Sequence, residues 1–155
     1  MMIRAMIAAL AALVPATLAA QAAQTVDYAI AAPAAGAWTY RPGAGTSHAL
    51  FTGVTASSRV SVSCNRQVRR VSISRTGVTA PVNALSVWTS SLQRSVAARH
   101  DLAAMSVIAE LAAFDGLLDA MAFSRGRFVI GTQGLAPLVV PGSPEVARVI
   151  EDCRI

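Results

Sequence analysis

Lysine is absent from this chain of 155 residues, and all 13 of its basic side chains are arginines. Without a lysine ammonium group, the chain excludes the Walker A motif, Schiff-base chemistry and any catalytic lysine. Histidine and cysteine are nearly as scarce, with two of each, which is too few for a zinc finger or a scaffold held by many disulfides. The few acidic residues show no glycosidase pattern, in which two carboxyls come from separate segments.

Apolar residues make up 54% of the chain, which is too high for a disordered protein. Part of this content lies at the N-terminus, where Arg4 precedes an uncharged apolar stretch over residues 5–20 and an Ala-Gln-Ala pattern over residues 20–22. A basic start, an apolar stretch and small residues at a cleavage site are typical of a secretory signal peptide. The stretch is shorter than the roughly 20 residues that cross a bilayer, so we expect residues 1–22 to be a signal peptide.

The remaining chain is expected to be one exported domain, periplasmic or secreted, with no transmembrane segment, because no later apolar run reaches spanning length. Residues 23–36 lack periodicity and contain Pro33 and Gly36, so we expect a flexible leader there. Residues 37–155 have the length of a single domain and are expected to be β-rich. No cluster of metal-ligand residues is visible, and we expect no cofactor and no metal.

The two cysteines, Cys64 and Cys153, both lie in the part expected to be exported. In an oxidising compartment an even pair most simply forms a disulfide. Cys64 ends an alternating segment in which it shares one face with Val60 and Val62. Cys153 follows apolar residues at helical spacing. Both thiols should face the core, which predicts a bridge between a strand and a C-terminal helix.

Short alternating segments separated by turn residues predict a mainly β (α+β) domain, an antiparallel β-sandwich or a barrel-like fold. The expected strands are residues 37–41, 47–51, 59–65, 68–75, 84–90, 92–97, 127–132 and 135–140. Asp115 is expected to cap a short helix, and Ser143 with Pro144 to begin a C-terminal helix. The first part of residues 101–122 is ambiguous, because its apolar spacing favours a helix and its alternation permits a strand.

The arginines gather in two places, between residues 59 and 75 and on both sides of Gly126. Guanidinium groups bind phosphate and carboxylate in a bidentate manner, which makes certain arginines candidates for anion binding. These candidates are Arg69, Arg70, Arg75, Arg125 and Arg127. The alternatives are that the first group is the solvated side of a hairpin, and that Arg125 or Arg127 pairs with Asp115, Asp119 or Glu151.

Catalytic patterns are scarce. A Ser-His-Asp triad that uses His48 or His100 stays open, because triad members need not be adjacent, but there is no G-x-S-x-G motif. The glycine-containing residues 43–48 resemble only the start of a phosphate-binding loop, and a hairpin turn is expected there. We therefore expect no enzyme and no catalytic residue. Nucleic acid is not an expected partner of an exported domain.

The stretch over residues 117–154, LLDAMAFSRGRFVIGTQGLAPLVVPGSPEVARVIEDCR, resembles small exported proteins of alphaproteobacteria of the sphingomonad type. Those proteins similarly have a tryptophan that begins the first strand, a mid-chain cysteine, a Thr-Ser after a strand and a closing Glu-Asp-Cys-Arg. Here these positions are Trp38, Cys64 and residues 89–90 and 151–154. The resemblance implies a strand over residues 103–111, and it transfers no catalytic residue to this chain. The plan is also similar, in architecture alone, to periplasmic proteins of the invasion-associated locus B type.

These observations favour a non-enzymatic exported binding or interaction module that contacts an envelope protein or an anionic glycan through an arginine-rich face. One alternative is a protein inhibitor of an envelope-directed hydrolase such as lysozyme, which would insert residues 41–48 or 76–83 into the active site. A more remote alternative is a small hydrolase that uses His48 or His100.

Overall fold

The computed structural model describes residues 27–155, so the expected signal peptide and the first residues of the expected leader lie outside the described part. The strands are β1 (Gly36–Gly43), β2 (Thr46–Gly53), β3 (Arg59–Asn65), β4 (Arg70–Thr76), β5 (Ala84–Trp88), β6 (Gln93–Asp101), β7 (Ser106–Ala112), β8 (Arg127–Thr132) and β9 (Leu135–Pro141). A short 3-10 helix, η1 (Ala56–Ser58), follows β2, and the α-helices are α1 (Gly116–Ala122) and α2 (Pro144–Asp152). Among the described residues, neither α-helix is long and apolar enough to cross a membrane.

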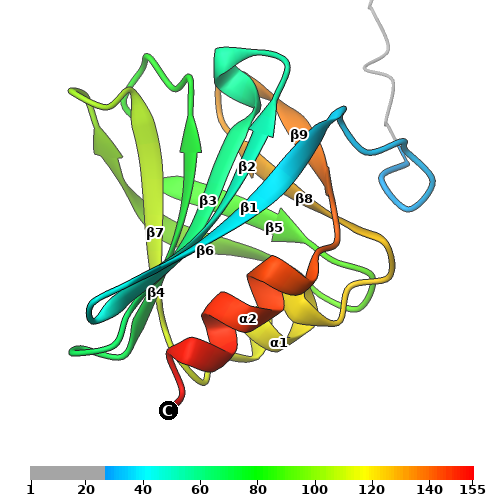
Figure 1. Ribbon diagram of the computed structural model, residues 1–155. Coiled ribbons are helices and arrows are strands. Elements are labelled where there is room, and N and C mark those ends of the chain that lie inside the picture. Colours follow the sequence, from blue (N-terminus) through cyan, green and yellow to red (C-terminus); the bar gives the residue numbers. More distant parts are fainter. Residues whose placement is uncertain (1–26) are drawn as a thin grey trace, which may run out of the picture.

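The nine strands form one antiparallel sheet in the order β1-β2-β3-β4-β7-β6-β5-β8-β9. The sheet curls until its two outermost strands approach each other, and α1 and α2 cover one end of the enclosed core (Figure 1). The expected mainly β fold with two helices is therefore confirmed, in its barrel-like form. The strand that the resemblance implied over residues 103–111 is β7, but it begins only at Ser106, because residues 102–105 form the turn that joins it to β6.

Alternation along the strands decides which side chains enter the core. Val60 and Val62 of β3 and Val71 and Ile73 of β4 are fully buried, whereas the serines between them face outward and are only half-buried. On the outer face, Ser61 and Ser74 are joined by a hydrogen bond of 2.7 Å between their hydroxyls. The hydrophobic pattern therefore sets the register of the hairpin, because a slip of one residue would expose its valines.

The C-terminal helix closes one end of the core. Its N-cap, Ser143, accepts a hydrogen bond from the main-chain N–H of Glu145, and Pro144 occupies the first helical position. Val149 and Ile150 are fully buried. The predicted disulfide is confirmed: Cys153, which follows α2, is bonded to Cys64 of β3, with their Cα atoms 5.4 Å apart.

The first and last strands meet at a seam, formed by Trp38 of β1, Pro141 and Val139 of β9, and Ala34 before β1. The indole N–H of Trp38 donates to the carbonyl of Pro141 at 2.9 Å, and the N–H of Ala34 donates to the carbonyl of Val139 at 2.8 Å. The Trp38 ring also packs between Phe51 and Phe128, at centroid distances of 5.5 and 6.0 Å. The seam therefore depends on one hydrogen bond from an indole and one between main-chain groups, and β1 and β9 are not joined by a ladder of main-chain hydrogen bonds.

The side chain of Arg75 lies inside the curled sheet, with an exposed fraction of 3%. Its guanidinium donates to the carbonyls of Ile130 at 2.8 Å and Ala136 at 2.6 Å. These acceptors lie at an irregularity where the single residue between Ile130 and Thr132 faces two residues of β9. Burial lowers the pKa of the Arg75 guanidinium. Arg75 therefore joins the two halves of the sheet and does not belong to an external arginine face.

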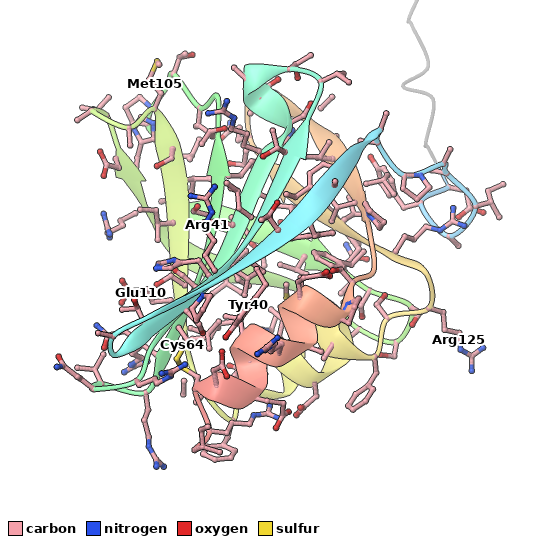
Figure 2. The ribbon with its side chains drawn as sticks, viewed as in Figure 1. Tyr40, Arg41, Cys64, Met105, Glu110 and Arg125 are labelled. Atoms are coloured by element: carbon pink, nitrogen blue, oxygen red, sulfur yellow. A yellow bond between two sulfur atoms is a disulfide. The ribbon has the colours of Figure 1, made fainter. Side chains whose placement is uncertain are left out.

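A polar cluster holds the end of α2 against β1. The hydroxyl of Tyr40 donates to the carboxylate of Asp152 at 2.7 Å, and Arg66 lies 3.6 Å from the same carboxylate. The guanidinium of Arg148 lies 4.2 Å from the centre of the Tyr40 ring. Figure 2 shows Tyr40 between β1 and α2. Burial alone would raise the pKa of the Asp152 carboxyl, but the Tyr40 hydrogen bond and the charges of Arg66 and Arg148 lower it below its ordinary value.

Removal of the disulfide should destabilise the domain without changing its fold. The bridge joins residues separated by 89 positions, and chain entropy gives an upper value of about 4–5 kcal/mol for a loop of this length. The free energy of unfolding of a C64A/C153A variant should be lower by up to this amount, measured by urea denaturation. Reductant should lower the stability of the parent protein and leave that of the variant unchanged. An equal response of both to reductant would contradict this prediction.

Asp152→Asn should cost about 1 kcal/mol at neutral pH, because it replaces a charged hydrogen-bond acceptor that is partly screened by solvent. Since folding lowers the pKa of this carboxyl, its contribution is complete above the unfolded value of about 3.9 and is lost as the pH falls through the folded value. The stability difference from the parent should therefore shrink below about pH 4. Glu151→Gln, which removes the adjacent exposed carboxylate, is the control. A difference for Asp152→Asn that stays constant down to the acid transition would refute this assignment.

Candidate functional site

A pocket of about 510 Å³ opens on the outer face of β5 and β8, within the range of about 300–1,000 Å³ typical of small-ligand sites. We call it the Trp88 pocket. Three segments line it: residues 27–29, residues 88–93, and residues 125–129. Its lining residues are Asp27, Tyr28, Ala29, Trp88, Thr89, Ser90, Gln93, Arg125, Arg127, Phe128 and Val129.

Trp88 is the central aromatic residue of this pocket. Leu85 and Val87 of β5 face the core, so the alternation turns Trp88 to the outer face. Its indole lies directly over Gly131 of β8, where an added Cβ would come within 2.3 Å of the ring. On its other side the ring of Tyr28 is stacked, at a centroid distance of 5.6 Å and an interplanar angle of 30°. The indole therefore lies low on the sheet and stays half-buried.

The loop that presents Arg125 and Arg127 is held in place by serine hydroxyls. The N–H of Ser90 donates to the hydroxyl of Ser124 at 3.0 Å, and the N–H of Arg125 donates to the hydroxyl of Ser90 at 3.1 Å. The hydroxyl of Ser124 also donates to the carbonyl of Arg127. These bonds fasten the α1–β8 connection to the β5–β6 connection, so the main chain below the two arginines is fixed.

The two arginines differ in their surroundings. Arg125 is exposed and projects away from the domain, as Figure 2 shows. Arg127 is half-buried, and its guanidinium donates to the carbonyl of Ala31. That contact, the Tyr28 stacking and the bond from Ala34 to Val139 place residues 27–34 along β8 and β9. The expected leader therefore includes a segment that forms one wall of the pocket.

The structure does not gather the candidate arginines on one face. Arg69 and Arg70 are exposed on the β3–β4 hairpin, which lies at the lower left of Figure 1, whereas the α1–β8 connection lies to the right, beyond the two helices. Arg75 is inside the core. Only Arg125 and Arg127 are brought together, at the Trp88 pocket.

The ion pairs proposed as the alternative role for Arg125 and Arg127 are formed by other residues. Arg94 lies 2.7 Å from Asp115. Arg154 lies 2.7 Å from Asp119 and 3.1 Å from Glu151. Within residues 27–155, no carboxylate lies within 4 Å of Arg125 or Arg127. The two guanidinium groups at the pocket therefore keep their charge uncompensated at close range.

The histidines lie apart from this pocket. His48 is exposed on the outer face of β2, and the Nε2 atom of His100 lies 2.8 Å from the carbonyl of Val78. In the described part of the chain, no hydrogen bond joins either histidine to a serine or a carboxylate. The described residues also contain no group of three side chains that could hold a metal ion.

The two segments considered for an inhibitory loop are bound within the fold. Residues 41–48 belong to β1 and β2, which are paired from Arg41 opposite His48 down to a turn at residues 44 and 45. Residues 76–83 include Val78, which is buried and whose N–H donates to the carbonyl of Met105 at 3.0 Å. The exposed parts of these segments are the β1–β2 hairpin around its turn and residues 79–81, which lie outside any helix or strand.

Sequence reasoning identified Arg125 and Arg127 but missed the aromatic part of the pocket. The alternation of β5 places Trp88 on the opposite face from Leu85 and Val87, and this pattern indicates an aromatic side chain on the outer face. Tyr28 could not be found in this way, because it comes from a segment without periodicity and reaches Trp88 only through a contact across 60 positions of the chain.

Comparisons of the chain with protein-family models, with curated proteins and with solved structures found no match. The resemblance to exported alphaproteobacterial proteins stays a prediction. A fold can support many functions, so the function has to be inferred from the chemistry of the pocket.

Replacement of Gly131 by Ala should push the Trp88 indole off the sheet, because the new Cβ would overlap the ring. Overpacking of this kind costs about 1–3 kcal/mol. We expect a change in tryptophan emission that is absent when the same substitution is made in a Trp88→Phe background. Gly116→Ala is the matched control, since nothing lies within 4 Å of its added Cβ. Unchanged emission and stability in Gly131→Ala would refute the described position of the indole.

Proposed function

We propose that this chain is an exported, non-enzymatic binding module that holds an anionic glycan of the cell envelope in the Trp88 pocket. The observation that carries the proposal is a pocket lined by Trp88, Tyr28 and the half-buried Arg127, beside which the exposed side chain of Arg125 projects into solvent. Ligand sites commonly combine apolar walls with a few polar groups that orient the ligand.

The chemistry of the lining fits an acidic saccharide. Guanidinium groups bind carboxylate and phosphate through two parallel hydrogen bonds, and Arg125 is exposed and available for this role. The Tyr28 ring and the part of the Trp88 indole that lines the pocket beside it supply apolar area against which a sugar ring can pack. Gln93 and Ser90 also line the pocket, and their side chains can exchange hydrogen bonds with hydroxyl groups.

The same lining supports binding more than catalysis. It contains one carboxylate, from Asp27, and neither histidine nor cysteine. General acid–base chemistry and nucleophilic chemistry usually need a positioned partner for the reacting group. The pocket therefore supplies charge complementarity and ring surface, which are the requirements for recognition of an acidic sugar.

Export is supported by the expected signal peptide and by the disulfide. Cys64 and Cys153 are the only cysteines of the chain and are bonded to each other. Structural disulfides persist in oxidising compartments and are rare in the cytosol. An envelope glycan is therefore a ligand that the domain would meet where it resides.

The proposal is tested by titrating the protein with hexagalacturonate, an acidic oligosaccharide, in calorimetry at low and moderate salt. Arg125→Gln should weaken binding about tenfold, which corresponds to the loss of one charge-assisted hydrogen bond. Arg70→Gln is the matched control, because it removes one exposed guanidinium on the distant hairpin, and its affinity should change less than about twofold. The fully methyl-esterified hexamer should bind far more weakly than the acid.

Equal losses for Arg125→Gln and Arg70→Gln would mean that binding depends on net charge alone, and would overturn the assignment to this pocket. No measurable binding of the acidic oligomer by the parent protein would overturn the proposed function.

A further inference from the structure

A second hollow, of about 240 Å³, also borders Trp88. Its lining residues are Val82, Asn83, Ala84, Ser86, Trp88, Gly131, Thr132, Gln133 and Pro137. Trp88 is the one residue that this hollow shares with the Trp88 pocket. Its volume is below the range of about 300–1,000 Å³ typical of a complete small-ligand site. The second hollow is therefore suited to hold one part of a larger ligand.

The two hollows follow each other along the outer face of β5. Ala84, Ser86 and Trp88 point outward in turn, because Leu85 and Val87 between them are buried. Ser86 and Trp88 line the second hollow, while Trp88 and the residues that follow it line the Trp88 pocket. A ligand that occupies both hollows must therefore be elongated and must cross the stacked pair of Trp88 and Tyr28.

Gly131 makes such a path possible. This residue pairs with Ser86 across β5 and β8, and the indole lies against it at a distance that no other residue would allow. With a larger residue at this position, the indole would have to move from the sheet and could stand between the two hollows. Glycine instead keeps the indole, with Tyr28 stacked on it, close to the sheet, so that the stacked pair stands low between the two hollows.

The two hollows differ in charge. The residues that line the Trp88 pocket include two arginines, Arg125 and Arg127, and one acidic residue, Asp27. The second hollow has no charged side chain among its lining residues, and its polar groups are the amides of Asn83 and Gln133 and the hydroxyls of Ser86 and Thr132. Amide and hydroxyl groups both donate and accept hydrogen bonds, which matches the hydroxyls of a sugar ring.

A peptide fits this surface poorly. Peptides that bind as added strands need an exposed sheet edge with free main-chain groups. β5 is paired with both β6 and β8, and β8 is paired with both β5 and β9. The main chain under both hollows is therefore already engaged, and recognition has to come from side chains.

We propose that the Trp88 pocket and the second hollow are adjacent subsites for one linear glycan, which places an acidic unit beside Arg125 and a hydroxyl-rich unit beside Asn83 and Gln133. This inference rests on the proposed function and adds the form of the ligand. It makes affinity depend on the length of the oligosaccharide, and it assigns the two ends of the ligand to different residues.

The test is a calorimetric titration with galacturonate and its oligomers up to the hexamer. For the parent protein, the affinity should rise about tenfold or more from the monomer to the longer oligomers. In an Asn83→Ala/Gln133→Ala variant this gain should be lost, while the affinity for the monomer stays unchanged. Gln67→Ala, which removes an exposed amide on the β3–β4 hairpin, is the control and should keep the full gain. Arg125→Gln should weaken the binding of monomer and oligomers alike.

Two results would overturn the inference while leaving the proposed function in place. One is equal affinity for monomer and oligomers in the parent protein. The other is a loss in Asn83→Ala/Gln133→Ala that is the same for the monomer and for the longest oligomer. Failure of every oligomer to bind the parent protein would overturn the proposed function and this inference together.

Discussion

The closure of the curled sheet is the constraint on which the rest of this structure depends. A curled sheet leaves two edges whose main-chain groups need partners, and here one indole N–H and one main-chain hydrogen bond join them. The edge strands carry Pro42, Pro137 and Pro141, which cannot donate to a ladder and are confined to such positions. The seam also places residues 27–34 along β8 and β9. Closure therefore produces the wall of the Trp88 pocket as well as the core.

Inside the sheet, Arg75 shows how the fold accommodates an irregular ladder. The carbonyls of Ile130 and Ala136 lie at the offset between β8 and β9, and the Arg75 guanidinium binds both. An unpaired carbonyl in the core would cost desolvation energy without compensation. Three buried or half-buried cationic side chains, Arg75, Arg127 and Arg154, all donate to main-chain carbonyls. Much of the arginine content of this chain is therefore structural, and only Arg125 is left exposed at the pocket.

Residue patterns predicted the local structure well where one face is buried. Val60, Val62 and Cys64 alternate toward the core as expected, and Ser143 and Pro144 begin the last helix. The same alternation places Arg75 on the inward face of β4, with Val71 and Ile73. It was nevertheless expected on the outside, because a charged residue at a strand end is ordinarily solvated. The pairing of Arg94 with Asp115 and of Arg154 with Asp119 could not be predicted, because these partners lie 21 and 35 positions apart.

The sequence by itself determined the strands, the capped helices, the disulfide and the outward direction of Trp88, since each depends on periodicity or residue chemistry over a few neighbouring positions. The tertiary structure alone decided which arginines share a site. Strand order places the β3–β4 hairpin far from the α1–β8 connection, and closure of the sheet brings Tyr28 to Trp88. Both outcomes depend on long-range packing, which local patterns do not encode. All 13 basic residues of this chain are arginines. Of the five that the sequence offered as candidates for anion binding, the fold brings only Arg125 and Arg127 to the Trp88 pocket.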